Sequence, residues 1–86
     1  MKERRVIGRC VLCENGYHTL QEGEWCYYLG VWFARPPGFE GIANLRGHSV
    51  TEHDDGTITV SPSIKIISNT AGIWHGHLER GVWREA

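Results

Sequence analysis

The clearest alternation of apolar and polar residues in this chain lies in the segment 57–61. Ile58 and Val60 alternate there with threonine and serine, which is the pattern of a strand with one dry and one wet face. The Asp54-Asp55-Gly56 sequence just before it favours a tight turn, because Asp-Gly tolerates the positive φ that hairpins require. We therefore predict a β-hairpin whose arms are residues 48–53 and 57–61.

The segment 24–34 is apolar at nearly every position. Strand alternation divides its side chains into two sets: Trp25, Tyr27, Leu29, Val31 and Phe33 on one face, and Cys26, Tyr28, Gly30 and Trp32 on the other. Apolar residues on both faces are typical of a buried central strand. We therefore predict one central strand over 24–34, bent at Gly30 and ended by the consecutive prolines at 36 and 37.

Short apolar segments separated by glycine make up the rest of the chain. Residues 6–12 predict a first strand, residues 42–45 a short apolar segment, and residues 73–79 and 82–84 a closing hairpin around Arg80-Gly81. Eleven glycines and three prolines are spread so evenly that the longest stretch free of both has nine residues. We therefore predict an all-β fold with little or no helix: a small antiparallel sheet folded into a sandwich or barrel, as a single domain over residues 1–86.

Composition and charge narrow the functional classes. With 41% hydrophobic and 22% charged residues, the chain has the composition of a globular protein. Nine basic against ten acidic residues give a net charge of -1, which provides no positive field for nucleic acid, so we expect no nucleic-acid partner. No apolar run has membrane-spanning length and no signal-peptide hydrophobic region is present, which favours a cytoplasmic protein with no membrane partner.

The three cysteines cannot all pair within one chain, and in a reducing cytoplasm we expect thiols or metal ligands rather than disulfides. Cys10 and Cys13 have the Cys-x-x-Cys spacing of a zinc knuckle, and His18 and Cys26 would complete a tetrahedral set of ligands. Free cysteines are often buried, so plain core thiols are the favoured interpretation. A zinc-stabilised structural module is the alternative.

The sequence His75-Gly76-His77-Leu78-Glu79 is a second place where polar side chains could act together. Residues two apart share a face of a strand, so His75, His77 and Glu79 project together, as a metal site or an acid–base pair requires. The wet face of any half-buried strand gives the same alternation, and we favour that interpretation. A small metal-dependent hydrolase centred on His75 and His77 is the alternative. Because the sequence lacks the common catalytic motifs, we expect a protein that is not an enzyme.

Four tryptophans, three tyrosines and two phenylalanines are many large rings for 86 residues. A buried ring contributes about 2 to 3 kcal/mol, so most should lie in the core. Tryptophan, tyrosine and arginine also anchor protein interfaces. We predict a partner-binding patch drawn from residues near strand ends and loops: Trp32, Arg35, Phe39 and Trp83. Unpaired edge strands further favour a homodimer.

The order of motifs in the last third of the chain resembles that of a family of small phage and bacterial proteins of unknown function. Three segments carry the resemblance: Ser61-Pro62-Ser63-Ile64, Trp74-His75-Gly76-His77-Leu78 and Gly81-Val82-Trp83. Some phage members are labelled ammonia monooxygenase. The resemblance implies a compact β fold and a phage-related origin, but no reaction. That family often has a cysteine-rich turn before the hairpin and another cysteine just before the tryptophan-histidine motif, which together look like a zinc site. In this chain residues 35–41 and 71–72 stand at those two places and contain no cysteine.

Three functional hypotheses follow. The favoured one is a non-enzymatic protein-binding module, which the resemblance makes a phage-encoded modulator or inhibitor of a host defence protein. The alternatives are the zinc-stabilised module and the metal-dependent hydrolase described above. Apart from zinc in these alternatives, we expect no cofactor.

Overall fold

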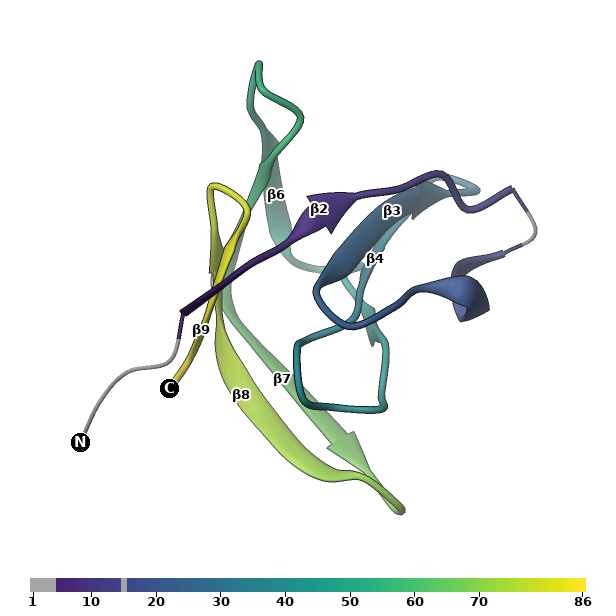
Figure 1. Cartoon of the computed structure of the whole chain (residues 1–86), viewed down its shortest axis with the longest axis vertical. Coiled ribbons are helices and arrows are strands. Elements are labelled where there is room, and N and C mark those ends of the chain that lie inside the picture. Colours follow the sequence, from purple (N-terminus) through teal and green to yellow (C-terminus); the bar gives the residue numbers. More distant parts are fainter. Residues whose placement is uncertain (1–4, 15) are drawn as a thin grey trace.

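The structure is a computed structural model that describes residues 5–14 and 16–86. It is all-β, with about half of the chain in strands, and a single 3-10 turn (η1, Tyr17–Thr19) is the helical element of these ranges. Two sheets pack against each other and do not form a closed barrel (Figure 1). The predicted all-β class is confirmed. Of the two predicted architectures, a sandwich or a barrel, the structure has two packed sheets and no closed barrel. No helix in the described ranges is long and apolar enough to cross a membrane.

Within the described residues the first sheet has five antiparallel strands in the order β1-β9-β8-β7-β6. These strands are β1 (Arg5–Ile7), β6 (Ser49–Glu52), β7 (Ile58–Ser68), β8 (Gly72–Glu79) and β9 (Val82–Glu85). The second sheet has four strands over the same residues, in the order β2-β3-β4-β5, with β2 and β3 parallel and the other neighbours antiparallel. They are β2 (Arg9–Cys10), β3 (Glu24–Tyr28), β4 (Val31–Ala34) and β5 (Ala43–Asn44). The predicted β6–β7 and β8–β9 hairpins are confirmed.

The prediction of one central strand over 24–34 is wrong. This segment folds into two strands, β3 and β4, joined by a two-residue turn at Leu29 and Gly30. Both turn residues have positive φ, 49° at Leu29 and 81° at Gly30, as the tightest hairpins require. A Leu-Gly turn is missed because leucine is not a residue that favours this conformation.

The turn also changes which side chains share a face. Phe33 pairs with Cys26 and lies on its face, whereas alternation along a single strand would put it on the face of Trp25. Trp25 packs toward the first sheet, and Cys26 packs toward the chain that connects β2 to β3. Both faces of the hairpin are therefore buried near its base, which is why the segment is apolar throughout.

The core has two parts, one on each side of the second sheet. The larger part joins the two sheets and contains Trp25, Ala34, Phe39, Ala43, Leu45, Ile58, Val60, Ile64, Trp74, Leu78 and Trp83. The smaller part contains Cys13, Leu20, Cys26 and Phe33, with Tyr17 and Val11 packed beside them. The connection between β2 and β3 thus forms a third layer over the second sheet.

The predicted strand over 6–12 is interrupted at Gly8, where the chain crosses from the first sheet to the second (Figure 1). A Cβ on Gly8 would lie 2.3 Å from the carbonyl oxygen of Gly23 and 2.5 Å from the ring of Trp25, so the crossing requires glycine. The Gly8 N–H donates to the Gly81 carbonyl at 2.8 Å. The crossing is thereby tied to the turn between β8 and β9.

Candidate functional site

The structure does not bring the four residues of the predicted zinc site together as one set of ligands. Cys13 and Cys26 form a disulfide, so neither sulfur is a thiolate that could bind zinc. Cys10 is a free, exposed thiol, and the exposed His18 ring lies against Tyr17 at 4.2 Å between centroids. Across residues 5–14 and 16–86, no group of three or more His, Cys, Asp or Glu side chains could hold a metal ion. The expectation of thiols is wrong for Cys13 and Cys26, because the fold brings these two sulfurs together across two layers.

The remaining thiol, Cys10, is not activated for nucleophilic chemistry. Desolvation raises the pKa of the Cys10 thiol, and the negative charge of Glu52 raises this pKa further, while the Trp25 indole opposes both. A raised pKa keeps the thiol protonated near neutral pH, and the thiolate is the reactive form. The surroundings of Cys10 therefore do not favour its thiolate form.

His75, His77 and Glu79 project from the same face of β8, as the alternation predicts. The two rings lie 6.4 Å apart between centroids. Nε2 of His75 is 3.0 Å from the Ser63 hydroxyl oxygen, and the Glu79 carboxylate accepts from the Arg84 guanidinium at 3.0 Å. The three side chains are thus engaged by different neighbours, and this geometry adds no support to the hydrolase hypothesis.

The glycine between the two histidines has a structural role. Gly76 is buried, and a Cβ there would lie 2.5 Å from the Trp74 ring and 2.5 Å from the carbonyl oxygen of Arg84. Trp74 meets Trp83 edge-on, with 5.6 Å between ring centroids. The motif that carries the sequence resemblance therefore holds the larger core together.

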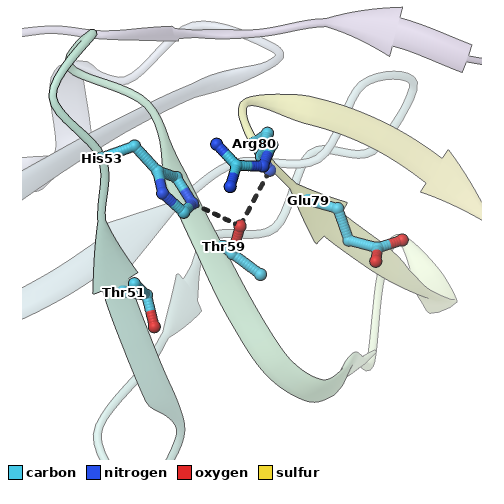
Figure 2. Close-up of a pocket in the computed structure, with 5 residues that line it drawn as sticks. All are labelled: Thr51, His53, Thr59, Glu79 and Arg80. Carbon is cyan, nitrogen blue, oxygen red and sulfur yellow. Dashed lines mark hydrogen bonds between the residues drawn. The ribbon is translucent and has the colours of Figure 1, made fainter.

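A shallow pocket opens on the outer face of the first sheet, between the β6–β7 hairpin and the β8–β9 turn (Figure 2). It has a volume of about 460 Å³ and is lined by Thr51, His53, Thr59, Glu79 and Arg80. Thr51 and Thr59 are direct cross-strand partners, and Arg80 is the first residue of the β8–β9 turn. The pocket therefore collects side chains from three strands and two turns.

Thr59 is the centre of the hydrogen bonds in this pocket. Its hydroxyl oxygen accepts the Arg80 backbone N–H at 3.0 Å and lies 2.7 Å from Nε2 of His53 (Figure 2). In the tautomer with a proton on Nδ1, the Thr59 hydroxyl donates to Nε2, so both bonds form at once. These bonds hold the imidazole and the turn in place. The Arg80 guanidinium makes no hydrogen bond or ion pair with any residue in the described ranges.

Two carboxylates beside the pocket already have partners. Glu79 pairs with Arg84, and in Figure 2 its carboxylate points away from His53. Asp55 accepts the hydroxyl of Thr57 at 2.6 Å and the N–H of the same residue at 3.0 Å. The Thr57 bonds lower the pKa of Asp55, and the positive charge of His53 adds a smaller contribution in the same direction. Both carboxylates therefore have partners other than Arg80.

A second hollow of about 330 Å³ continues the pocket along β7. Its lining is Thr59, Val60, Ser61, Pro62, Ser63, His77 and Glu79. The β7–β8 register shifts between Val60 and Ile64, so β7 carries a bulge, and Pro62 lies in it because proline cannot donate to the ladder. His77 of the predicted histidine pair therefore faces a groove of hydroxyl groups.

Large apolar side chains face solvent around the β3–β4 turn. Leu29 is 85% exposed and Tyr27 is 58% exposed, and the Tyr27 ring meets Trp32 edge-on at 5.1 Å. Leu12, 84% exposed, follows Val11, whose N–H extends the β2–β3 ladder. Val11 and Cys13 both pack into the smaller core, so the Leu12 side chain between them is directed away from that core. We name Leu12, Tyr27, Leu29 and Trp32 the apolar patch.

Of the four predicted partner-binding residues, Trp32 belongs to this patch. Phe39 and Trp83 are core residues, 6% and 1% exposed, so the structure corrects their prediction as contact residues. Arg35 is half-buried and donates to the carbonyls of Leu20 and Phe39, each at 3.1 Å, which gives it a structural role. The two prolines after Arg35 turn the loop back toward the sheets. The ring of Phe39 therefore lies in the larger core and does not face water.

Sequence reasoning missed Leu29 and Arg80, the residues at the tips of the two exposed surfaces. The Arg80-Gly81 turn is predicted from the sequence, but its proximity to His53 depends on the pairing of β7 with both β6 and β8. For Leu29, the available signal is the following glycine. If Leu29-Gly30 had been recognised as a two-residue turn, the sequence would have placed this leucine at the tip of a hairpin.

Comparison with known proteins found no matching family model, no matching curated protein and no matching solved structure. The resemblance to small phage and bacterial proteins therefore stays a prediction, as does the cytoplasmic location. The pocket and the apolar patch are the surface features that bear on function.

Proposed function

We propose that this protein is a non-enzymatic protein-binding module that docks on its partner through the apolar patch. The observation that carries this proposal is the exposure of large apolar side chains: Tyr27 and Leu29 at the end of the β3–β4 hairpin, and Leu12 in the chain that follows β2. Burying such a side chain fully contributes about 1.5 to 3 kcal/mol, and the isolated chain leaves most of this contribution unused. A partner that covers the patch would recover it.

The composition of the patch is that of an interface centre. Tyr27 and Trp32 are direct cross-strand partners, so the β3–β4 ladder sets their spacing. Trp32 also packs partly against the larger core, which orders it before a partner arrives. Aromatic side chains lose little conformational entropy on binding, and Trp and Tyr are enriched among residues that dominate binding energies.

The backbone at Leu29 supports the same proposal. Its φ of 49° lies in the left-handed region, which costs a residue other than glycine about 1 to 3 kcal/mol. Asparagine or glycine would satisfy this turn with less strain. An exposed leucine in that position serves neither the turn nor the core, which supports a role in binding.

The partner that we propose is a protein. The phage resemblance supports a host protein, such as a defence protein, which the module would modulate or inhibit by covering part of its surface. The zinc-stabilised module and the metal-dependent hydrolase lack a favouring observation in the described residues, so we propose neither.

Two matched double variants test the proposal. Tyr27→Ala with Leu29→Ala removes the patch, whereas Ile67→Ala with Ile73→Ala removes a cross-strand pair of isoleucines that are 72% and 64% exposed. That pair lies near the tip of the β7–β8 hairpin, at the lower end of Figure 1.

Proteins captured from cells of the natural host and identified by mass spectrometry should bind the wild type and the isoleucine variant. The patch variant should no longer capture these proteins. Equal capture by both variants, at unchanged melting temperatures, would contradict docking through the patch.

A further inference from the structure

We propose that the pocket between the β6–β7 hairpin and the β8–β9 turn binds a phosphate group (Figure 2). Its donors are the Arg80 guanidinium, the His53 imidazole and the Thr51 hydroxyl. This inference is independent of the apolar patch, which lies on the other sheet.

Arg80 is the first observation. Its φ is 46°, in the left-handed region where asparagine and glycine are favoured at the first position of such a turn. The guanidinium has no protein partner within the described residues, and in Figure 2 it lies on the pocket side of the turn. A strained backbone with an unused charge at a pocket is explained by a ligand more readily than by folding.

The second observation is the preorganisation of His53. The hydroxyl of Thr59 holds Nε2 at 2.7 Å, and the same hydroxyl accepts the backbone N–H of Arg80, so Thr59 fixes the imidazole and the backbone of the turn that carries the guanidinium. Nδ1 of His53 and the hydroxyl of Thr51 have no partner in the described part of the chain and remain free to donate. A ligand would therefore meet an imidazole that is already held in place, while its binding would order the exposed Arg80 side chain.

The neighbouring negative charges do not oppose an anion strongly. Glu79 is paired with Arg84 and directed away, and Asp55 is bonded by Thr57. Asp54 and Glu52 are exposed to water, which screens their charges at physiological ionic strength. Arg80 is therefore the lining residue that offers an anion a positive charge without a partner in the described residues.

The arrangement of donors favours phosphate over carboxylate. Thr51 lies on β6, His53 follows that strand, and Arg80 belongs to the turn beyond β8, so the candidate donors come from three separate places in the fold. A planar carboxylate is satisfied by the fork of one arginine, whereas a tetrahedral phosphate has three oxygens to be bonded. The open pocket also admits a group attached to a larger molecule.

Titration of the isotopically labelled protein with orthophosphate, followed by amide chemical shifts, tests the proposal. Chloride and acetate at equal ionic strength are the comparison ions. We expect saturable shifts at Thr51, Thr59 and Arg80, with a dissociation constant in the millimolar range for so exposed a site. O-phosphoserine in a parallel titration separates free phosphate from a phosphate ester, according to which binds more tightly.

Arg80→Gln should weaken phosphate binding at least tenfold. Arg46→Gln, which changes an exposed arginine beside another glycine, should leave binding unchanged. Arg80→Asn suits the turn, so loss of binding in that variant cannot be assigned to misfolding. Equal binding of acetate, shifts spread evenly over all arginines, or unchanged binding in Arg80→Asn would each overturn the proposal.

Discussion

Leu29 and Arg80 are the residues other than glycine that have positive φ in the described ranges, at 49° and 46°. Each is the first residue of a two-residue turn and precedes a glycine that also has positive φ. Each side chain lies in one of the two proposed binding surfaces. Strain in these turns is therefore located where a ligand could compensate for it.

Replacing these residues separates folding from binding. Leu29→Asn and Arg80→Asn convert both turns to Asn-Gly, so each should raise the free energy of unfolding by about 0.5 to 1 kcal/mol. In a chain of this size about 1 kcal/mol raises the melting temperature by about 4 to 8 °C, which scanning calorimetry detects. Arg46→Asn is the control and should give no increase. Lower melting temperatures for both turn variants would show that these side chains serve the fold.

Glu24 is a buried carboxylate, 5% exposed, held by the Gln21 N–H and the Arg9 guanidinium, each at 2.7 Å. Burial by itself would raise the pKa of Glu24, but these two partners outweigh it and the net shift is downward. A folded pKa below the unfolded value of 4.5 means that ionised Glu24 stabilises the fold above that pH. This stabilisation is lost as the pH falls from 4.5 through the folded pKa.

We expect Glu24→Gln to lower the free energy of unfolding by about 1 kcal/mol at pH 7. The figure is small because the Arg9 side chain is 74% exposed and water screens its charge. Urea denaturation at pH 7 and pH 3 measures the difference between the two proteins. The difference should shrink at pH 3, and an equal difference at both values would contradict the role of the charge.

At the scale of elements, the chain between β2 and β3 is held to the second sheet by the smaller core and by the Cys13–Cys26 disulfide. Its backbone makes few ladder bonds of its own, since its regular structure is the η1 turn. The stability of this third layer therefore depends on the cross-link and on a few side chains. Tyr17, stacked on Phe33 at 3.9 Å between centroids, is one of them.

Reduction should loosen this layer. The cross-link closes a sequence separation of 13 residues, for which the chain-entropy estimate is about 3 kcal/mol of stability. We expect urea denaturation of the reduced protein, or of Cys13→Ser with Cys26→Ser, to show a loss of that size, and Cys10→Ser to show none. Thiol titration of protein purified without reductant should find one reactive cysteine per chain. If titration finds three thiols per chain and reductant leaves the free energy of unfolding unchanged, the Cys13–Cys26 disulfide is contradicted.

At the scale of the whole molecule, two open sheets leave strands at their edges. β6 is one edge of the first sheet, and three of its four side chains are exposed. An edge strand with free backbone groups can pair with that of a second copy, and a twofold dimer then covers both edges. We therefore keep homodimerisation as a prediction.

Light scattering coupled to size exclusion measures the mass directly. We expect the mass of two chains at micromolar concentration, because pairing of edge strands with adjoining side chains buries surface on both copies. The patch variant with Tyr27→Ala and Leu29→Ala should remain a dimer, since its patch lies on the other sheet. The mass of a single chain across the accessible concentrations would reject the dimer.

The local patterns in this chain were sufficient for the class of fold and for two of its hairpins. Ile58 and Val60 alternate with polar neighbours whatever the rest of the chain does, and Asp-Gly and Arg-Gly restrict the backbone at each turn. The same local rules failed at Leu29, where a residue that disfavours the left-handed region nevertheless occupies it. They also failed at Phe39 and Trp83, because nearness to a loop in sequence does not determine exposure.

Alternation of residue types and the placement of glycine determined that this chain forms short strands joined by tight turns, because both act on the backbone within a few residues. Only the tertiary structure decided that Cys13 meets Cys26, that Arg80 lies over a pocket with His53, and that Tyr27 faces water while Trp25 does not. These outcomes depend on which strands pair and in what register, and that choice is made by the packing of residues far apart in the chain.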